Sequence, residues 1–221
     1  VSATGIERIR FATSHPKDLN DDVIKAFGEL DNLMPALHLP VQSGSNAILK
    51  AMHRRYTREH YLETIKKLRE VRPDIALSTD IIVGFPGETE EDFQQTYDLI
   101  KEVGYTQVFT FIYSKREGTP AARMEDNTPR EVIQERFERL VDLVQEGALE
   151  ANQAEAGKIV PVLVEGVSKR DDSVLMGRSP KNQTVHAPIP EGVSIEDIQG
   201  TIVNVRIDVA RAWYLRGQVV S

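Results

Sequence analysis

The chain has 221 residues, of which 40% are hydrophobic and 28% charged, and its formal net charge is −7. These proportions are ordinary for a soluble globular protein and exclude a disordered chain. The sequence has no cysteine, which excludes disulfides, thiol catalysis and any cysteine-held zinc or iron–sulfur site within this chain. It also has no apolar run of the roughly 18 residues that a membrane span needs and no signal-peptide core, so we expect a cytoplasmic location.

The first part of the chain alternates predicted strands with predicted helices. The strand patterns cover residues 6–13, 36–42, 75–85 and 107–114, and the helix patterns cover residues 18–30, 46–53, 56–71 and 89–104. Thr89 and Asp92 can form a capping box at the start of the last of these helices, and Gly104 suits its end. This alternation is typical of parallel strands joined by right-handed crossovers.

A long helix is predicted next. Thr128, Pro129 and Glu131 suit the N-cap, N1 and N3 positions, and apolar residues recur at helical spacing after them, so we expect a helix that ends near Gly157. Four strands make an incomplete (β/α) barrel, and the chain begins without an initiator Met. We therefore expect it to be the C-terminal portion of a longer protein.

From Lys158 onward the pattern changes to short strands separated by Gly, Pro, Asp and Asn turns, at residues 158–167, 173–179, 184–189 and 200–220. Strands at this spacing indicate a small all-β barrel. Residues 158–221 carry eight Lys or Arg and seven Asp or Glu, about +1, which leaves 19 basic and 27 acidic residues, or −8, in the first 157. We predict two domains, 1–157 and 158–221, and expect the second to contact a polyanion.

Polar side chains follow the predicted strand at residues 36–42. Gln42 and Ser43 come at its end, before a Gly-Ser-Asn turn into a helix, where side chains and free backbone donors can orient a polar ligand. An explanation as turn and cap residues is equally good for Ser43. His38 lies between two leucines and points away from them, which favours a core or inner-barrel histidine over a metal ligand.

The segment STDIIVGFPGETEEDF, at residues 78–93, reads as a buried strand that enters a helix through a Gly-Phe-Pro-Gly turn. Asp80 lies near the carboxyl end of this strand, where parallel α/β proteins bind ligands, although a satisfied polar group inside the barrel is an equal explanation. The acids after the turn favour the helix dipole and oppose a bound phosphate, and no GxxxxGK[ST] loop exists. A cationic or zwitterionic ligand fits this end better.

Four segments, LHLPVQSGS, AILKAMHRRYTREHYL, STDIIVGFPGETEEDF and FTFIYSKREGTPAARM, together resemble the radical S-adenosylmethionine methylthiotransferases. The resemblance is strongest to the bacterial branch that modifies isopentenylated adenosine in tRNA, with a C-terminal TRAM domain. A branch that acts on threonylcarbamoyladenosine is a close alternative, and a branch that modifies a ribosomal-protein aspartate is more distant. A non-catalytic RNA-binding protein is another possibility that the sequence leaves open.

This resemblance implies the C-terminal part of a TIM-like radical SAM barrel followed by an OB-like TRAM barrel. It also implies S-adenosylmethionine (SAM) as cofactor and two [4Fe–4S] clusters whose ligands lie outside this chain, so that this part holds no catalytic residue. The expected reaction inserts a methylthio group at carbon 2 of the adenosine. The expected partners are the tRNA anticodon stem-loop and an electron donor such as flavodoxin or ferredoxin, with no membrane.

The resemblance assigns the adenosyl part of SAM to residues 79–85. Asp80, Ile82 and Gly84 align with a GxIxGxxE-type motif, although Asp80 stands at the first Gly and Gly87 at the final Glu. The predicted cofactor-binding residues are Gln42, Ser43, Thr79, Asp80, Ile82, Gly84, Phe85, Tyr113 and Ser114. The predicted RNA contacts are Arg54, Arg55, Arg116, Arg123, Lys169, Arg170, Arg178, Lys181, Arg206 and Arg211. Each of these basic residues could equally be a solvated surface group.

Overall fold

The structure is a computed structural model that describes residues 5–12, 15–126 and 128–220. It divides into two compact units, with the division between Gln145 and Glu146 inside a long helix. The predicted domain boundary after residue 157 lies beyond that helix and stays a prediction. In the described part of the chain, no helix combines the length and the apolar character that crossing a lipid bilayer requires.

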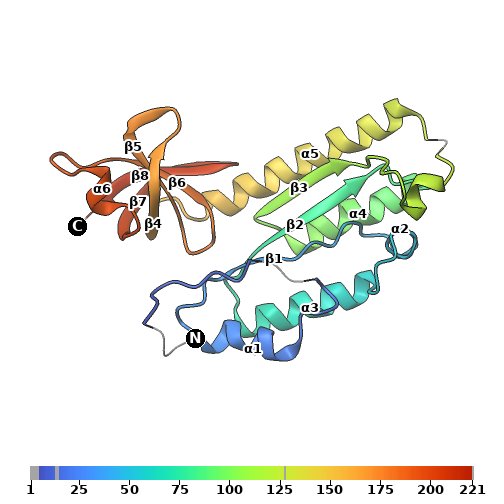
Figure 1. The fold of residues 1–221 in the computed structure, drawn as a ribbon, viewed down its shortest axis with the longest axis horizontal. Coiled ribbons are helices and arrows are strands. Elements are labelled where there is room, and N and C mark those ends of the chain that lie inside the picture. The colour runs from blue at the N-terminus through green and yellow to red at the C-terminus, as the bar shows by residue number, and fades with distance from the viewer. Residues whose placement is uncertain (1–4, 13–14, 127, 221) are drawn as a thin grey trace. The chain divides into compact units, whose positions relative to one another are not determined.

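The first unit contains a parallel sheet in the order β1-β2-β3, with helices before, between and after its strands along the chain (Figure 1). Its strands are β1 (Ala36–His38), β2 (Ala76–Val83) and β3 (Gln107–Ile112). Its helices are α1 (Asp21–Glu29), α2 (Asn46–Ala51), α3 (Arg58–Val71), α4 (Glu90–Val103), the short 3₁₀ helix Pro120–Arg123 and α5 (Arg130–Gln153), which continues into the second unit. The predicted parallel pairing, with helices between consecutive strands, is confirmed in this sheet, and the right-handedness of the crossovers stays a prediction.

The last residue of the predicted first strand, residues 6–13, lies outside the described residues. Residues 6–12 do not join the sheet, and among them only Ile9 pairs, through an isolated parallel bridge to Leu33. The Ile9 N–H donates to the Asn32 carbonyl at 2.7 Å and the Met34 N–H donates to the Ile9 carbonyl at 2.8 Å. The segment therefore pairs with a loop rather than with a strand, which is why its apolar residues do not make a strand here.

Strand β2 shows the alternation of buried and partly exposed residues that a sheet with one covered face requires. Leu77, Thr79, Ile81 and Val83 face a single core to which α3, α4 and α5 also contribute. Ser78, Asp80 and Ile82 face the other side and are only partly buried. One face of the sheet is thus covered by helices, and the second is open.

The ends of α4 and α5 test two predictions from the sequence. The capping box of Thr89 and Asp92 is confirmed, and Gly104 ends α4 in the left-handed conformation with φ 61°. Helix α5 ends at Gln153, earlier than the predicted end near Gly157. The reason is that the Gly157 N–H already donates to the Ile207 carbonyl at 2.8 Å, so the chain has left the helix for the β unit.

The second unit is a closed barrel of five strands in the order β4-β5-β6-β8-β7, antiparallel except for the pair β6–β8. The strands are β4 (Ile159–Ser168), β5 (Asp171–Arg178), β6 (Thr184–Pro188), β7 (Ile202–Arg211) and β8 (Tyr214–Val220), with a short helix α6 (Ile195–Ile198) before β7. Its core contains Val162, Val164, Leu175, Val185, Val205 and Leu215. The predicted small barrel is confirmed, and the predicted run at residues 200–220 is a hairpin of two strands.

Candidate functional site

The open face of the sheet carries a cluster of polar and aromatic side chains. His38, Ser78 and Asp80 come from β1 and β2, and Phe109 and Phe111 stand beside Asp80 and Ile82 on β3. Phe109 is 42% exposed and Phe111 51% exposed, although both lie within a strand. Large apolar side chains are seldom left exposed on a strand without a partner, so this face is the first candidate for a binding surface.

His38 connects the two polar residues of β2 on this face. Its Nδ1 lies 3.0 Å from the Ser78 hydroxyl, and its Nε2 lies 3.5 Å from the Asp80 carboxylate. Its ring contacts Phe109 edge-on at 5.9 Å between centroids. The sequence placed no acid at a metal-ligand spacing from His38, because the acid that it contacts lies 42 positions later, on the neighbouring strand. Within the described residues, no three His, Cys, Asp or Glu side chains form a group that could hold a metal ion.

Gln42 extends the pairing of β1 beyond its last regular residue. Its N–H donates to the Asp80 carbonyl at 2.9 Å, and its carbonyl accepts from the Ile82 N–H at 3.0 Å. The residue has φ 73°, which is unusual for a residue other than glycine. Strained backbone of this kind is often kept at ligand sites, and the two backbone bonds to β2 place Gln42 at the carboxyl end of the sheet.

The side chains of Ser43 and Thr79 lie in the core rather than on this surface, and their predicted contact with the cofactor stays a prediction. Thr79 Oγ1 accepts the Val41 N–H at 2.9 Å and donates to the Leu39 carbonyl at 3.0 Å. The Ser43 hydroxyl lies 3.2 Å from the Thr96 hydroxyl of α4. Both side chains are fully buried: strand alternation directs Thr79 to the helix-covered side, whereas Ser43 lies in the loop between Gln42 and α2. Only their backbone atoms are left for a ligand on the open face.

The loop after β2 is held by a buried carboxylate. Glu88 is 4% exposed, and its Oε2 accepts the Gly84 N–H at 2.8 Å. Arg136 of α5, 5% exposed, donates to the Glu88 carbonyl at 3.0 Å and lies 3.6 Å from its carboxylate. Gly84 has φ 72°, and a Cβ there would lie 2.7 Å from the Ile133 side chain. The loop is therefore fixed at both ends against α5.

Burial raises the pKa of Glu88 to about 7, while the Gly84 N–H and the Arg136 guanidinium act in the opposite direction. From the sequence, the acids in this region are explained by the helix dipole. That explanation holds for Glu90, Glu91 and Asp92, which lie in the first turn of α4, but not for Glu88. Its role was missed because its ion partner is 48 positions away and nothing in the local sequence indicates it.

Tyr113 lies just beyond β3 at the same end of the sheet. Its N–H donates to the Val83 carbonyl at 2.8 Å, and its ring contacts the buried Phe85 edge-on at 5.2 Å. Its hydroxyl oxygen is buried and has no hydrogen-bond partner among the described residues. A buried hydroxyl left in this way costs about 1–3 kcal/mol, so it indicates a missing polar partner. The next residue, Ser114, is exposed.

The predicted RNA contacts of the first unit are spread over several loops. Arg54 Nη1 lies 3.4 Å from His15 Nε2, and Arg55 is exposed beside it. Arg116 and Arg123 are exposed around the 3₁₀ helix that follows β3.

In the second unit, three of the six predicted basic contacts already have acidic partners. Arg178 lies 3.4 Å from Glu165, Lys181 lies 2.7 Å from Glu155, and Arg206 lies 3.4 Å from Asp208. Lys169, Arg170 and Arg211 are exposed. The paired residues are weaker candidates for phosphate contacts, since RNA would have to displace a carboxylate from each of them.

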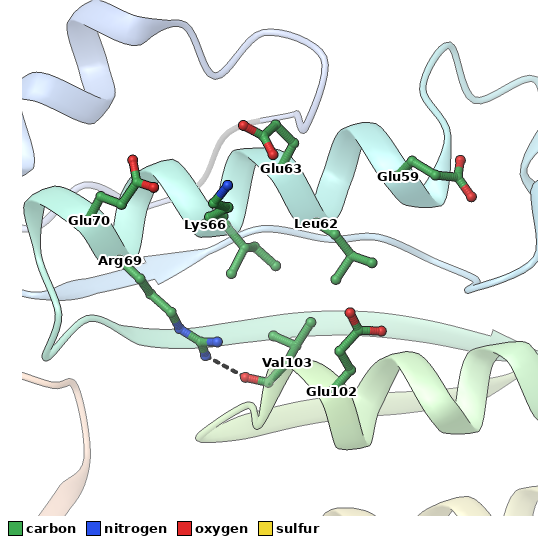
Figure 2. Close-up of a pocket in the computed structure, with 9 residues that line it drawn as sticks. Glu59, Leu62, Glu63, Lys66, Arg69, Glu70, Glu102 and Val103 are labelled. Carbon is green, nitrogen blue, oxygen red and sulfur yellow. Dashed lines mark hydrogen bonds between the residues drawn. The ribbon is translucent and has the colours of Figure 1, made fainter.

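A separate open groove of about 620 Å³ lies between α3 and α4 (Figure 2). Apolar side chains, including Leu62 and Val103, line it together with charged ones such as Glu63, Lys66 and Glu102. The Arg69 guanidinium donates to the Val103 carbonyl across the groove. None of the predicted site residues contributes to its lining.

Comparisons with known proteins agree with both units. Residues 2–100 match the Radical SAM superfamily and residues 153–220 match the TRAM domain. The proteins named tRNA-2-methylthio-N(6)-dimethylallyladenosine synthase from Alkaliphilus oremlandii (strain OhILAs) and Clostridium botulinum (strain Okra / Type B1) are 53% identical over 217 residues and 51% identical over 216 residues. Each alignment covers 98% of this chain but only 45% and 47% of the relative. The chain therefore spans about half the length of these relatives.

Among solved structures, coproporphyrinogen III oxidase (HemN) from Escherichia coli, a radical SAM enzyme, is similar with a TM-score of 0.52 at 14% sequence identity. The similarity covers 79% of this chain and 46% of that one. At this identity the likeness concerns the fold alone, and it confirms the predicted fold class.

Proposed function

Because residues 2–100 match the Radical SAM superfamily, residues 153–220 match the TRAM domain, and the chain is more than 50% identical to the relatives named above, we propose that it forms the barrel and RNA-binding part of a tRNA methylthiotransferase. The proposed reaction inserts a methylthio group at carbon 2 of isopentenylated adenosine next to the anticodon. The observation that carries this proposal is an identity above 50% over almost the whole chain to enzymes named for that product. This level of identity favours the isopentenyladenosine branch over the threonylcarbamoyladenosine and ribosomal-protein branches.

Members of the radical SAM superfamily use SAM with a [4Fe–4S] cluster, and when bound these groups supply radical chemistry that removes a hydrogen atom from an unreactive carbon. The cluster does not fit the residues of this chain, because a [4Fe–4S] cluster needs thiolate ligands and the sequence has no cysteine. We infer that this chain positions the cofactor and substrate, and that the ligands of two clusters lie in other parts of a longer protein.

SAM does fit the carboxyl end of the sheet. Among the described residues the Tyr113 hydroxyl is buried without a partner, and Gln42, with φ 73°, is held at the same end by its backbone bonds to Asp80 and Ile82. Asp80 presents a carboxylate on the open face, 28% exposed, which suits a ligand that carries a sulfonium and an ammonium charge. Ile82 supplies an apolar contact on that face, and Gly84 and Phe85 begin the fixed loop that follows β2. We propose that these residues hold the adenosyl part of SAM.

We further propose a cytoplasmic enzyme that binds the tRNA anticodon stem-loop and is reduced by a small donor such as flavodoxin or ferredoxin. Residues that the structure leaves exposed, namely Arg55, Arg116, Arg123, Lys169, Arg170 and Arg211, are the favoured phosphate contacts.

The test uses the longer protein that contains this chain, with its clusters reconstituted anaerobically. It is incubated with SAM, a reductant and tRNA that carries either isopentenyladenosine or threonylcarbamoyladenosine, and the nucleosides are analysed by mass spectrometry. A methylthio nucleoside from the first tRNA alone supports the proposal. Product from the second tRNA alone, or from ribosomal protein alone, would replace it with the corresponding alternative, and RNA binding without any product would favour a non-catalytic RNA-binding protein.

A further inference from the structure

Two large aromatic side chains are exposed on the hairpin of β7 and β8. Trp213, in the two-residue turn, is 53% exposed, and Tyr214, the first residue of β8, is 39% exposed. Trp213 is also the only tryptophan in the sequence. Neither residue is among the RNA contacts predicted from the sequence, because all of those are Lys or Arg. Neighbouring exposed aromatic rings on a small barrel indicate a binding surface.

Basic side chains accompany these rings. In the strand register, Tyr214 stands opposite Arg211, and Arg216 stands opposite both Val209 and His186. The Tyr214 ring contacts the His186 ring edge-on at 5.7 Å. We call the five residues Arg211, Trp213, Tyr214, Arg216 and His186 the hairpin surface.

The positive charges of the hairpin surface are available to a ligand. Among the described residues, neither Arg211 nor Arg216 has a carboxylate oxygen within salt-bridge distance, in contrast to Arg206, which pairs with Asp208 on the same hairpin. The charge of Arg216 does lower the pKa of Asp171, although hydrogen bonds to Ser173 are the larger cause. Burial and the charges of Arg216 and Arg178 lower the pKa of His186. The positive charge of the hairpin surface at neutral pH therefore comes from Arg211 and Arg216 rather than from His186.

The turn that carries Trp213 is held in place by a buried side chain. Asn152, 5% exposed, donates from its Nδ2 to the carbonyls of Arg211 at 2.6 Å and Ala212 at 3.1 Å. Its Oδ1 accepts from Gln183 Nε2 at 2.9 Å, which fixes the amide in turn. These bonds lie within the second unit. An aromatic residue on a fixed turn loses little conformational freedom when it binds.

We propose that the hairpin surface binds unpaired nucleotides of RNA, with Trp213 and Tyr214 stacking on bases and Arg211 and Arg216 contacting the flanking phosphates. This inference rests on the proposed function and names the part of the barrel that would meet the tRNA loop. Exposed rings beside unpaired arginines match the two demands of a single strand, whose base faces are open and whose backbone is charged. A duplex would offer its phosphates but no free base face to Trp213, so unpaired nucleotides are favoured.

The experiment titrates the longer protein with an anticodon stem-loop RNA and with a fully paired RNA of equal length. Trp213→Phe serves as the fluorescence blank, so the difference between wild type and this variant reports Trp213 alone. Binding is also measured by anisotropy of labelled RNA at several salt concentrations for Trp213→Ala and for the double variant Arg211→Ala/Arg216→Ala. The matched control is Arg206→Ala, because that guanidinium is exposed on the same hairpin but is paired with Asp208.

The stem-loop is expected to quench Trp213 fluorescence, whereas the paired RNA is not. Trp213→Ala should weaken stem-loop binding by roughly 5- to 100-fold without changing the slope of log affinity against log salt. The double arginine variant should reduce the magnitude of that slope by about one to two units, and Arg206→Ala should leave it close to that of wild type.

Failure of this inference can be distinguished from failure of the proposed function. If the stem-loop binds with wild-type affinity to Trp213→Ala and does not quench Trp213, the hairpin surface does not bind the RNA, although tRNA modification can still occur. Equal quenching by paired and unpaired RNA would overturn the preference for unpaired nucleotides. If no tRNA binds at all, both proposals fail. The quenching measurement needs only wild type and the mild Phe variant, so a folding defect in Trp213→Ala cannot leave the inference untested.

Discussion

Glu88 is a buried carboxylic acid, and its surroundings decide whether it makes the folded state more or less stable as the pH rises. Burial raises the pKa of its carboxyl from the ordinary 4.5 to about 7, despite the Gly84 N–H and the Arg136 guanidinium. The folded chain therefore binds this proton more tightly than the unfolded chain does. Stability from the protonated group is fully present below 4.5 and is lost as the pH rises through about 7.

Replacing Glu88 with Gln should remove this loss, because the amide oxygen can still accept the Gly84 N–H but does not titrate. Wild type is expected to lose on the order of 3 kcal/mol of unfolding free energy from this group between pH 4.5 and 7, and Glu88→Gln should not show that loss. Urea denaturation of both proteins across this pH range measures the difference. Parallel pH profiles for the two proteins would contradict the assignment.

Tyr113 offers a test of the cofactor site that separates binding from stability. Its hydroxyl is buried without a partner, so Tyr113→Phe should leave the unfolding free energy unchanged or raise it slightly while weakening equilibrium binding of SAM several-fold. Tyr105→Phe is the matched control, because the Tyr105 hydroxyl is buried but donates to Tyr61 at 2.8 Å. The control should lose about 1 kcal/mol of stability and keep its affinity for SAM. The opposite pattern would remove Tyr113 from the site.

At the scale of elements, the sequence predicted those whose signals are local. The capping box of Thr89 and Asp92 and the glycine stop at residue 104 marked α4 correctly, and the apolar run before them marked β2. Patterns that need a distant partner were less informative. Residues 6–13 have a strand pattern, but within the described part of this segment, residues 6–12, only Ile9 pairs. The long helix ends early because Gly157 bonds to a strand residue 50 positions later.

The candidate site shows the same limit. Residues at strand ends, such as Gln42 and Tyr113, could be chosen from the sequence because parallel strands meet at one edge. Which side chains face that edge depends on strand alternation and register, and this is why Thr79 was included although it faces the core. The contact between His38 and Asp80 and the ion pair of Glu88 with Arg136 join residues more than 40 positions apart, so no local pattern could indicate them.

The loop that joins β2 to α4 allows its packing to be tested with two glycines. Gly84 and Gly87 both have positive φ, 72° and 85°, but a Cβ would meet Ile133 only at Gly84, and nothing lies within 4 Å at Gly87. Gly87→Ala should therefore cost about 1–2 kcal/mol from backbone strain alone. Gly84→Ala should cost a further 1–3 kcal/mol or so from the clash with α5. Equal losses in thermal or urea denaturation would show that the loop is not packed tightly against Ile133.

At the scale of the whole molecule, net charge differs between the two parts of the chain. The first 157 residues sum to −8 and the remaining 64 to about +1. At long range, RNA is therefore repelled by the first part and attracted only weakly by the second. Recognition of RNA would then depend on short-range contacts in the β barrel, where the exposed rings and unpaired arginines of the hairpin surface lie. This favours modest salt dependence and strong dependence on unpaired bases.

The absence of cysteine from the sequence leads to the last prediction, which concerns the chain by itself. After anaerobic reconstitution with iron and sulfide, the isolated chain should show neither the visible absorption of a [4Fe–4S] cluster nor stoichiometric iron, because no thiolate is present to hold it. It should also form no 5′-deoxyadenosine from SAM under reducing conditions. The longer protein, treated in parallel, should take up iron and form that product. Stoichiometric cluster absorption from the isolated chain would show that ligands other than cysteine bind iron here. It would overturn the proposal that the cluster ligands lie in other parts of a longer protein.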